Sequence, residues 1–190
     1  MGLDSIELLM EIENYFGISI PDAEAEKLYT IQIMVDSVAQ HLKISNENFE
    51  MRDKIFLRVT AIMKEFGWLV KNITPADFIG QYFPSTYKQD WKSFEDALRL
   101  SIPQPYFSSQ NPTLLESIIG KPLYKSDEIS FEQFVAAICA NNYQVLIDKN
   151  HINSKYEIYI AVMGITVDKL GVDYYEVGPD KSFTSDLGVD

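Results

Sequence analysis

The pattern of apolar and polar residues predicts an amphipathic helix at the start of this 190-residue chain. Between residues 3 and 16 apolar side chains recur every three or four positions, with acidic residues between them. This spacing places the apolar residues on one helical face. The apolar positions are Ile6, Leu9, Met10, Ile12 and Phe16. Gly17 follows where a helix commonly ends, because glycine adopts the left-handed conformation without strain.

Two further helices are expected before residue 45. Pro21 opens a short turn that Asp22, Glu24 and Glu26 follow, and proline with early acidic residues suits a helix N-terminus. Thr30 is typical of an N-cap, since its hydroxyl can accept a hydrogen bond from a free backbone N–H of the first turn. The apolar side of the helix that it begins consists of Ile31, Met34, Val35, Val38 and Leu42.

The C-terminal end of the chain repeats this pattern once. From Tyr156 to Leu170 apolar residues recur at helical spacing, and Gly171 marks the end of the helix. Residues 172–183 are rich in turn-forming residues and predict a loop. Each helix at the two ends has one apolar face, so each requires the others to bury it.

The middle of the chain also predicts helices, separated by loops that contain proline. Helical spacing occurs over residues 50–66, 91–100 and 111–119. Thr74-Pro75-Ala-Asp77 has the order of an N-cap, a first-turn proline and an early acid, so a helix is expected to begin there. Ser130 and Gln133 have the spacing of a capping box ahead of an apolar run.

Strand-like alternation is scarce, and only residues 143–147 predict a strand. The middle is also rich in aromatic residues, which could line a ligand groove but more often form a core. They are Tyr82, Phe83, Tyr87, Trp91, Phe94, Tyr106 and Phe107. We therefore expect an all-α fold.

The distribution of charge separates the two ends from the middle. The net charge of −12 disfavours nucleic acid as a partner, because its phosphates would be repelled. Residues 1–45 carry a net charge of −6 and residues 155–190 carry −4, whereas residues 46–154 carry only −2. This acidic pattern predicts one domain made from both ends, 1–45 and 155–190, and a separate helical domain over 46–154.

Several classes of protein are not indicated. No run of 18 or more apolar residues occurs and no signal peptide is recognisable, so we expect no membrane contact. The single cysteine, Cys139, excludes an intrachain disulfide and fits a reducing cytoplasm. His41 and His151 are isolated from acids and cysteines in the sequence, so no metal site is expected. The chain lacks a nucleophile near a base and a glycine-rich phosphate loop, so we expect no enzyme and no catalytic residues.

The two ends form a single motif when the chain is read across its termini. The chain ends in Asp-Leu-Gly-Val-Asp190 and begins Met-Gly-Leu-Asp-Ser-Ile-Glu-Leu-Leu-Met10. Joined through Gly2, this string closely resembles the helix II entrance of acyl carrier proteins. The resemblance covers residues 1–44 and 156–190 in permuted order, and none covers the middle. Further motifs similar to the family are Ile20-Pro21-Asp22, Thr30-Ile-Gln32 and Leu170-Gly171-Val172.

The resemblance implies a four-helix bundle whose first helix comes from the end of the chain. In that family a serine at the start of helix II carries 4′-phosphopantetheine, and helix N-termini favour phosphate. The implied function is to tether acyl intermediates as thioesters during fatty-acid or polyketide-type synthesis, in lipid metabolism. The implied partners are a phosphopantetheinyl transferase and synthesis enzymes with basic docking faces.

The position of the attachment serine corresponds to Gly2. This residue lies five positions before Glu7 and nineteen before Pro21, as the family spacing requires. The neighbouring cofactor-site positions are Asp190, Leu3 and Asp4. Because glycine has no hydroxyl, we expect this chain to lack the prosthetic group.

Ser5 is the alternative attachment residue, because Gly-Leu-Asp-Ser imitates the Gly-x-Asp-Ser signature of carrier domains. Its distance to Glu7 is three residues too short for that register. The residues expected to dock partner enzymes are Glu7, Met10, Glu13 and Asp22, whereas Asn14 and Tyr15 replace acids that are common in the family. The alternative function is a carrier-like protein-interaction module without a prosthetic group.

Three accounts explain the order of the two ends. The chain is a circular permutant, a piece of a protein with two carrier domains, or naturally built this way. We favour permutation, because the ends meet without overlap or omission. In each account residues 156–190 must pack on residues 3–42, within one chain or in a domain-swapped homodimer. We expect Leu187 and Ile6 to share one apolar interior.

Overall fold

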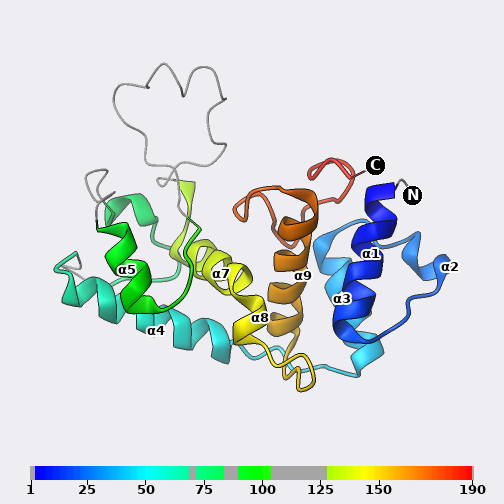
Figure 1. Cartoon of the computed structure of the whole chain (residues 1–190), viewed down its shortest axis with the longest axis horizontal. Coiled ribbons are helices and arrows are strands. Elements are labelled where there is room, and N and C mark those ends of the chain that lie inside the picture. The colour runs from blue at the N-terminus through cyan, green and yellow to red at the C-terminus, as the bar shows by residue number, and fades with distance from the viewer. Residues whose placement is uncertain (1–2, 69–71, 84–89, 104–127, 190) are drawn as a thin grey trace, which may run out of the picture. The chain divides into compact units, whose positions relative to one another are not determined.

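The computed structural model describes residues 3–68, 72–83, 90–103 and 128–189 (Figure 1). Gly2 and Asp190 lie outside these ranges, as does the helix expected over residues 111–119. The regular elements within these ranges are helices, and extended pairing is limited to isolated bridges, which confirms the predicted all-α fold. The chain divides into two compact units, Met1–Met51 with Cys139–Asp190, and Arg52–Ile138.

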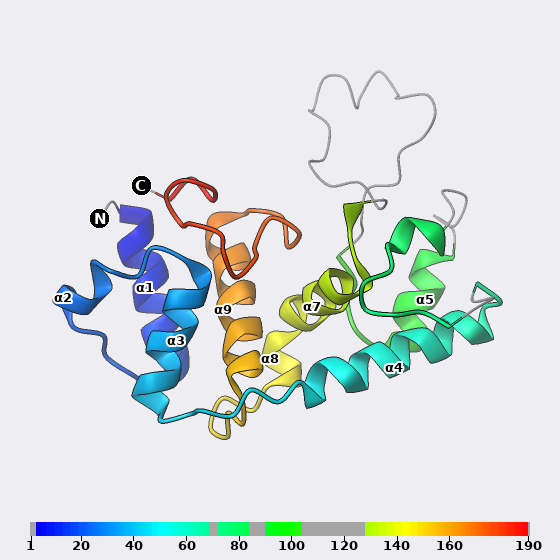
Figure 2. The same cartoon turned by 180° about the vertical axis from the view of Figure 1, so that it is seen from behind.

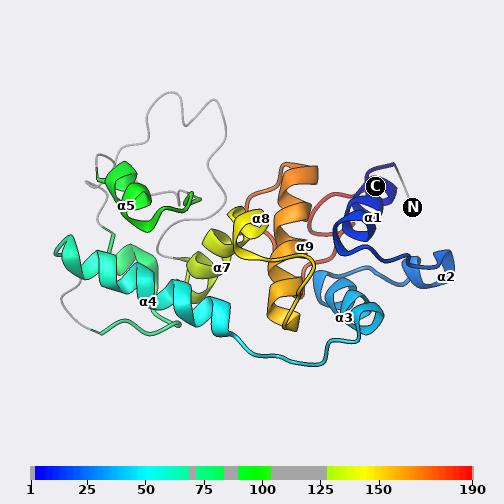
Figure 3. The same ribbon diagram turned by 60° about the horizontal axis from the view of Figure 1, so that its bottom comes forward.

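The first unit is built around α9 (Lys155–Leu170). It also contains α1 (Leu3–Phe16), α2 (Asp22–Ala25), α3 (Ile31–Leu42) and α8 (Tyr143–Leu146). α9 packs against α1, α3 and α8. Figure 2 and Figure 3 show α9 between α8 on one side and α1 with α3 on the other. The helix from the end of the chain is therefore the centre of this unit.

Local signals set the ends of these helices as predicted. The Thr30 hydroxyl accepts a hydrogen bond from the backbone N–H of Ile33 at 3.3 Å. Gly17 and Gly171 follow α1 and α9 with φ of +63° and +67°, which glycine adopts without strain. Ser154 also caps α9, accepting from the N–H of Glu157 at 3.2 Å.

Backbone hydrogen bonds join the two ends of the chain within one molecule. The N–H groups of Ile31 and Gln32 donate to the carbonyls of Lys181 and Pro179, at 3.1 and 2.9 Å. The N–H of Phe183 donates to the carbonyl of Tyr29 at 3.0 Å. These bonds satisfy free donors of the first turn of α3, so the C-terminal loop completes the start of that helix.

The expectation that Leu187 and Ile6 share one apolar interior is correct for the burial of Leu187 and wrong for Ile6. Leu187 is buried, with 7% of its surface exposed, but Ile6 is 43% exposed. The buried face of α1 consists of Leu8, Ile12 and Phe16. Positions two residues apart point to nearly opposite sides of a helix, so burial of Leu8 turns Ile6 outward.

The strand expected over residues 143–147 is also wrong. These residues form α8, in which the N–H of Ile147 donates to the carbonyl of Tyr143 at 2.9 Å. A single strand has no ladder partner in this helical unit. Instead, α8 contacts α9 through its buried residue Tyr143, whose ring lies beside Gly164, whereas Val145 is exposed. The two compact units meet at 51/52 and 138/139, and the domain boundaries predicted from the sequence are 45/46 and 154/155.

The second unit contains most of α4 (Glu50–Glu65), η1 (Ile79–Gln81), α5 (Trp91–Leu98) and the start of α7 (Phe131–Asn141). The capping box before α7 is confirmed, because Ser130 and Gln133 exchange hydrogen bonds of 2.9 and 3.2 Å. The α-helix expected to begin near Thr74 is absent. There the Asp77 carboxylate accepts the Thr74 N–H at 2.8 Å and closes a turn ahead of η1.

The aromatic residues of this unit form its core rather than a groove. Phe83 lies against Trp91 and Phe94, with ring centroids 5.5 and 5.8 Å apart. Phe131 and Phe134 are fully buried beside them. Tyr87, Tyr106 and Phe107 lie outside the described residues.

Candidate functional site

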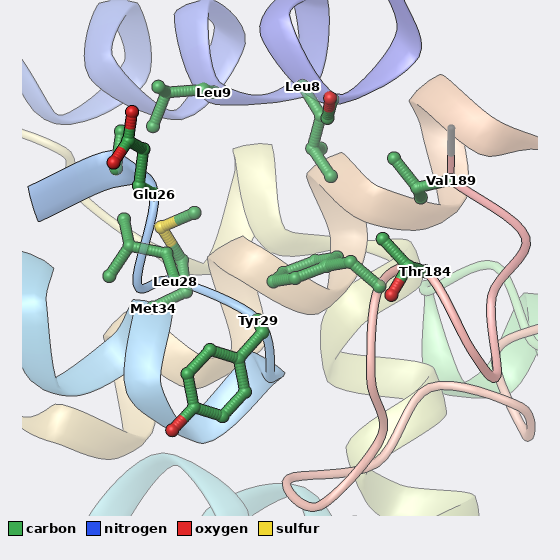
Figure 4. Close-up of a pocket in the computed structure, with 11 residues that line it drawn as sticks. Leu8, Leu9, Glu26, Leu28, Tyr29, Met34, Thr184 and Val189 are labelled. Carbon is green, nitrogen blue, oxygen red and sulfur yellow. The ribbon is translucent and has the colours of Figure 1, made fainter. Parts of the chain in front are cut away.

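An apolar cavity of about 130 Å³ lies in the first unit, between α1, the α2–α3 segment and the C-terminal loop (Figure 4). In Figure 4, Leu8 and Leu9 of α1 face Leu28 and Met34, and Val189 lies to one side. Both ends of the chain therefore contribute to one cavity. Its lining consists of Ser5, Leu8, Leu9, Ala25, Glu26, Leu28, Tyr29, Met34, Phe183, Thr184 and Val189.

The predicted attachment position immediately precedes α1 in the sequence. Gly2 and Asp190 lie outside the described residues, whereas Leu3 is the first residue of α1. Asp4 lies in the first turn and is exposed. A phosphodiester at the attachment position would meet the positive end of the α1 dipole, although Asp4 adds a negative charge there.

Ser5, the alternative attachment residue, lies inside α1 and is half-buried. It belongs to the wall of the cavity, together with Leu8 and Leu9 of the same helix. An arm on Ser5 would therefore start within the helix rather than ahead of it.

Two of the four predicted docking residues, Glu7 and Glu13, have side chains that bind other groups of the same chain. The Glu7 carboxylate pairs with the Lys169 ammonium of α9 at 2.8 Å. Their hydrogen bond raises the pKa of Lys169. Glu13 accepts the backbone N–H of Ile20 at 2.6 Å and so holds the loop that follows α1. Both carboxylates stabilise the bundle, a role that sequence reasoning missed.

The other two predicted docking residues are open to solvent. Met10 is 54% exposed and Asp22 is also exposed. Ile6 lies one helical turn before Met10 and adds a second exposed apolar side chain to the same face of α1. Glu7 and Glu11 follow these two residues in the sequence, so acidic and apolar side chains alternate here. Docking at this patch stays a prediction.

A polar cluster that the sequence did not reveal joins α2 to α3. Glu24 Oε1 accepts a hydrogen bond from Ser37 Oγ at 2.5 Å, and Glu24 Oε2 lies 3.1 Å from His41 Nε2. The Ser37 hydrogen bond, supported by His41, lowers the pKa of Glu24 despite the opposing effect of burial. The expectation that His41 is isolated from acids is therefore wrong, because the partner comes from another helix.

The chain leaves and re-enters the bundle at one place. The Lys155 N–H donates to the Asn46 carbonyl at 2.8 Å, and the Asn46 amide donates to the Asn153 carbonyl at 3.2 Å. The Lys155 ammonium also pairs with Asp36 at 2.9 Å and Glu47 at 3.5 Å. The segment after α3 thus lies beside the segment before α9.

Within the described residues, no three or more histidine, cysteine, aspartate or glutamate side chains gather as metal ligands would. None of the described helices combines the length and the apolar character that crossing a bilayer requires.

Comparison with known proteins identifies one segment. No family model and no solved structure matches the chain. An acyl carrier protein of Rubrobacter xylanophilus is 54% identical over 40 residues, which are 21% of this chain. The same 40 residues are 49% of that protein, so the chain spans about half the length of the curated relative that it matches. A segment of this chain is therefore similar to an acyl carrier protein, and the remainder is not recognised.

Proposed function

We propose that the two ends of this chain together form an acyl-carrier module, which holds acyl intermediates as thioesters and performs no catalysis itself. The observation that carries the proposal is the apolar cavity, which α1 and the C-terminal loop line together. Sheltering an acyl chain there would gain about 0.8 kcal/mol for each buried methylene group. The 54% identity of one segment to an acyl carrier protein supports the same role.

The proposed module works only when position 2 carries a serine. Gly2 offers no hydroxyl, so this chain holds no phosphopantetheine at that position. With serine there, a phosphopantetheinyl transferase would supply the arm. Enzymes of fatty-acid or polyketide-type synthesis with basic faces would then dock on the exposed α1 patch around Ile6 and Met10. We place this role in the cytoplasm, where the buried thiol of Cys139 stays reduced.

Loading by a transferase tests the proposal. After incubation with coenzyme A and a promiscuous phosphopantetheinyl transferase, we expect the native chain to keep its mass. The Gly2→Ser variant is expected to gain one phosphopantetheine group, because only that change supplies the hydroxyl. Intact-protein mass spectrometry measures both. A mass gain by the native chain that Ser5→Ala abolishes would assign attachment to Ser5 and refute the assignment to Gly2.

The alternative function is a carrier-like interaction module without an arm, and Gly2 itself favours it. Failure of a folded Gly2→Ser variant to load would support this alternative. In that case the exposed patch around Ile6 and Met10 would bind its partner without a thioester.

The volume of the cavity predicts the length of the sheltered chain. An apolar protein cavity of about 150 Å³ accommodates benzene, so the cavity of about 130 Å³ is expected to hold about six carbons. Gly2→Ser loaded with butyryl, hexanoyl, octanoyl or decanoyl groups should gain thermal stability up to the hexanoyl form and little beyond it. A continued rise through the decanoyl form would show that the chain lies elsewhere.

A further inference from the structure

Both carboxylate oxygens of Glu24 are engaged by α3. Oε1 accepts from the Ser37 hydroxyl at 2.5 Å, and Oε2 lies 3.1 Å from His41 Nε2. Ser37 is buried, and the side chains of Glu24 and His41 are about one-third exposed. Hydrogen bonds to a charged group are stronger than neutral ones, so this cluster is a firm link between α2 and α3.

α2 depends on such links for its position. It has only four residues, Asp22–Ala25, and the side chain of its N-cap residue Pro21 makes no capping hydrogen bond. A helix of one turn has little stability of its own, because nucleation costs more than so few hydrogen bonds return. Ala25 is its only buried residue. The Glu24 cluster is therefore a large share of what holds α2 in place.

α2 and the residues after it form one wall of the apolar cavity. Ala25, Glu26 and Leu28 belong to its lining. Figure 4 shows Leu28 across the cavity from Leu9 of α1. Movement of α2 away from α3 would carry this wall with it. Such movement would widen the cavity and change the space that it offers to an acyl chain.

We propose that Glu24 is a positioning residue that holds α2 in place as one wall of the cavity, with Ser37 and His41 as its anchors on α3. The proposal rests on the proposed function only for the identity of the cargo. The position of the wall itself is measurable without any cargo.

The proposal predicts a defined dependence on pH. The groups that act on Glu24 are Ser37 and His41 of α3 and Lys27 just after α2. The pKa of Glu24 in the folded chain is below its ordinary value of 4.5, chiefly because of the Ser37 hydrogen bond. The stabilisation is therefore present above the unfolded-state value and is lost as the pH falls through the lower folded-state pKa. Acidification through this folded-state pKa, which lies below 4.5, should release α2.

Hydrogen exchange on the whole native chain tests this. The backbone N–H groups of Ala25, Glu26 and Leu28 are hydrogen-bonded, so they report whether α2 is in place. Glu24→Gln and Ser37→Ala are expected to lower their protection about tenfold at neutral pH. Asp22→Asn, a matched change at an exposed acid of α2, should lower it less than about twofold. As the pH falls through the folded-state pKa of Glu24, which is below 4.5, the protection in the native chain should approach that in Glu24→Gln.

Two results would overturn the proposal. One is equal protection of these amides in Glu24→Gln and Asp22→Asn. The other is an equal loss of protection in α9, which would indicate global destabilisation rather than release of α2. If Ser37→Ala does not fold, the pH dependence of amide protection in α2 still tests the proposal. It is measured on the native chain and compared with Asp22→Asn. No prosthetic group is involved, so failure here is distinct from failure of Gly2→Ser to load.

Discussion

Replacing Gly164 by alanine is expected to lower the free energy of unfolding of the first unit by about 2 kcal/mol. Gly164 lies in the middle of α9, where alanine would otherwise stabilise the helix by about 1 kcal/mol. A Cβ at this position would lie 2.7 Å from the Ala140 carbonyl oxygen and 2.9 Å from Tyr143 Cε1. The Tyr143 ring can shift, but the Ala140 oxygen belongs to the backbone and cannot rotate away. Urea unfolding followed by far-UV circular dichroism measures the loss.

Gly178→Ala is the matched control for this prediction. A Cβ at Gly178 would meet only Lys181 Cγ at 3.7 Å, an ordinary contact, so a change within about 0.5 kcal/mol is expected. Gly164→Ala combined with Tyr143→Ala should not recover the native value, because the backbone clash with Ala140 remains. Equal stability of Gly164→Ala and Gly178→Ala would show that α8 does not pack on α9 as described.

The helices at the two ends could be predicted because their signals are local. Apolar spacing, Thr30 at an N-cap and Gly171 after a helix each act within a few residues. The burial of α9 on every side was not predictable in the same way. All residues from Ile160 to Thr166 are buried, which requires partners on both sides of the helix. The second partner is α8, for which the sequence predicted a strand. A short apolar run does not show which element it packs against, so helix and strand could not be told apart.

The candidate site likewise contains residues that local motifs predicted and contacts between distant helices that they did not predict. Met10 and Asp22 were predicted as docking residues by matching motif positions. Both are exposed, and their docking role stays a prediction. The Glu7–Lys169 pair joins helices that are far apart in the sequence, so no spacing rule could indicate it. The same holds for Glu24, whose partners lie on another helix. Carboxylates that appeared free for partners or solvent are therefore used in part to hold the bundle together.

The first unit is expected to fold alone when it keeps residues 139–154. Residues 139–190 joined directly to residues 2–51 contain α9 with its partners α1, α3 and α8, and the last three residues of α7. Val189 and Ser5 line one cavity, so the two pieces can be joined across the present termini without a long linker. We expect this rearranged chain to be helical by circular dichroism and to unfold cooperatively in urea.

A shorter version, residues 154–190 joined to residues 2–46, is expected to lose about 3 kcal/mol or more. It lacks Tyr143 and Ile147, and burying one such side chain contributes about 1.5–3 kcal/mol. The absence of α8 would also expose the second apolar side of α9 to water. Equal stability of the two versions would place the boundary of the carrier bundle at α9 itself, and residues 139–154 would then belong with the middle of the chain. A longer version that fails to fold while the shorter one folds would refute the central position of α9 between α8 and the bundle.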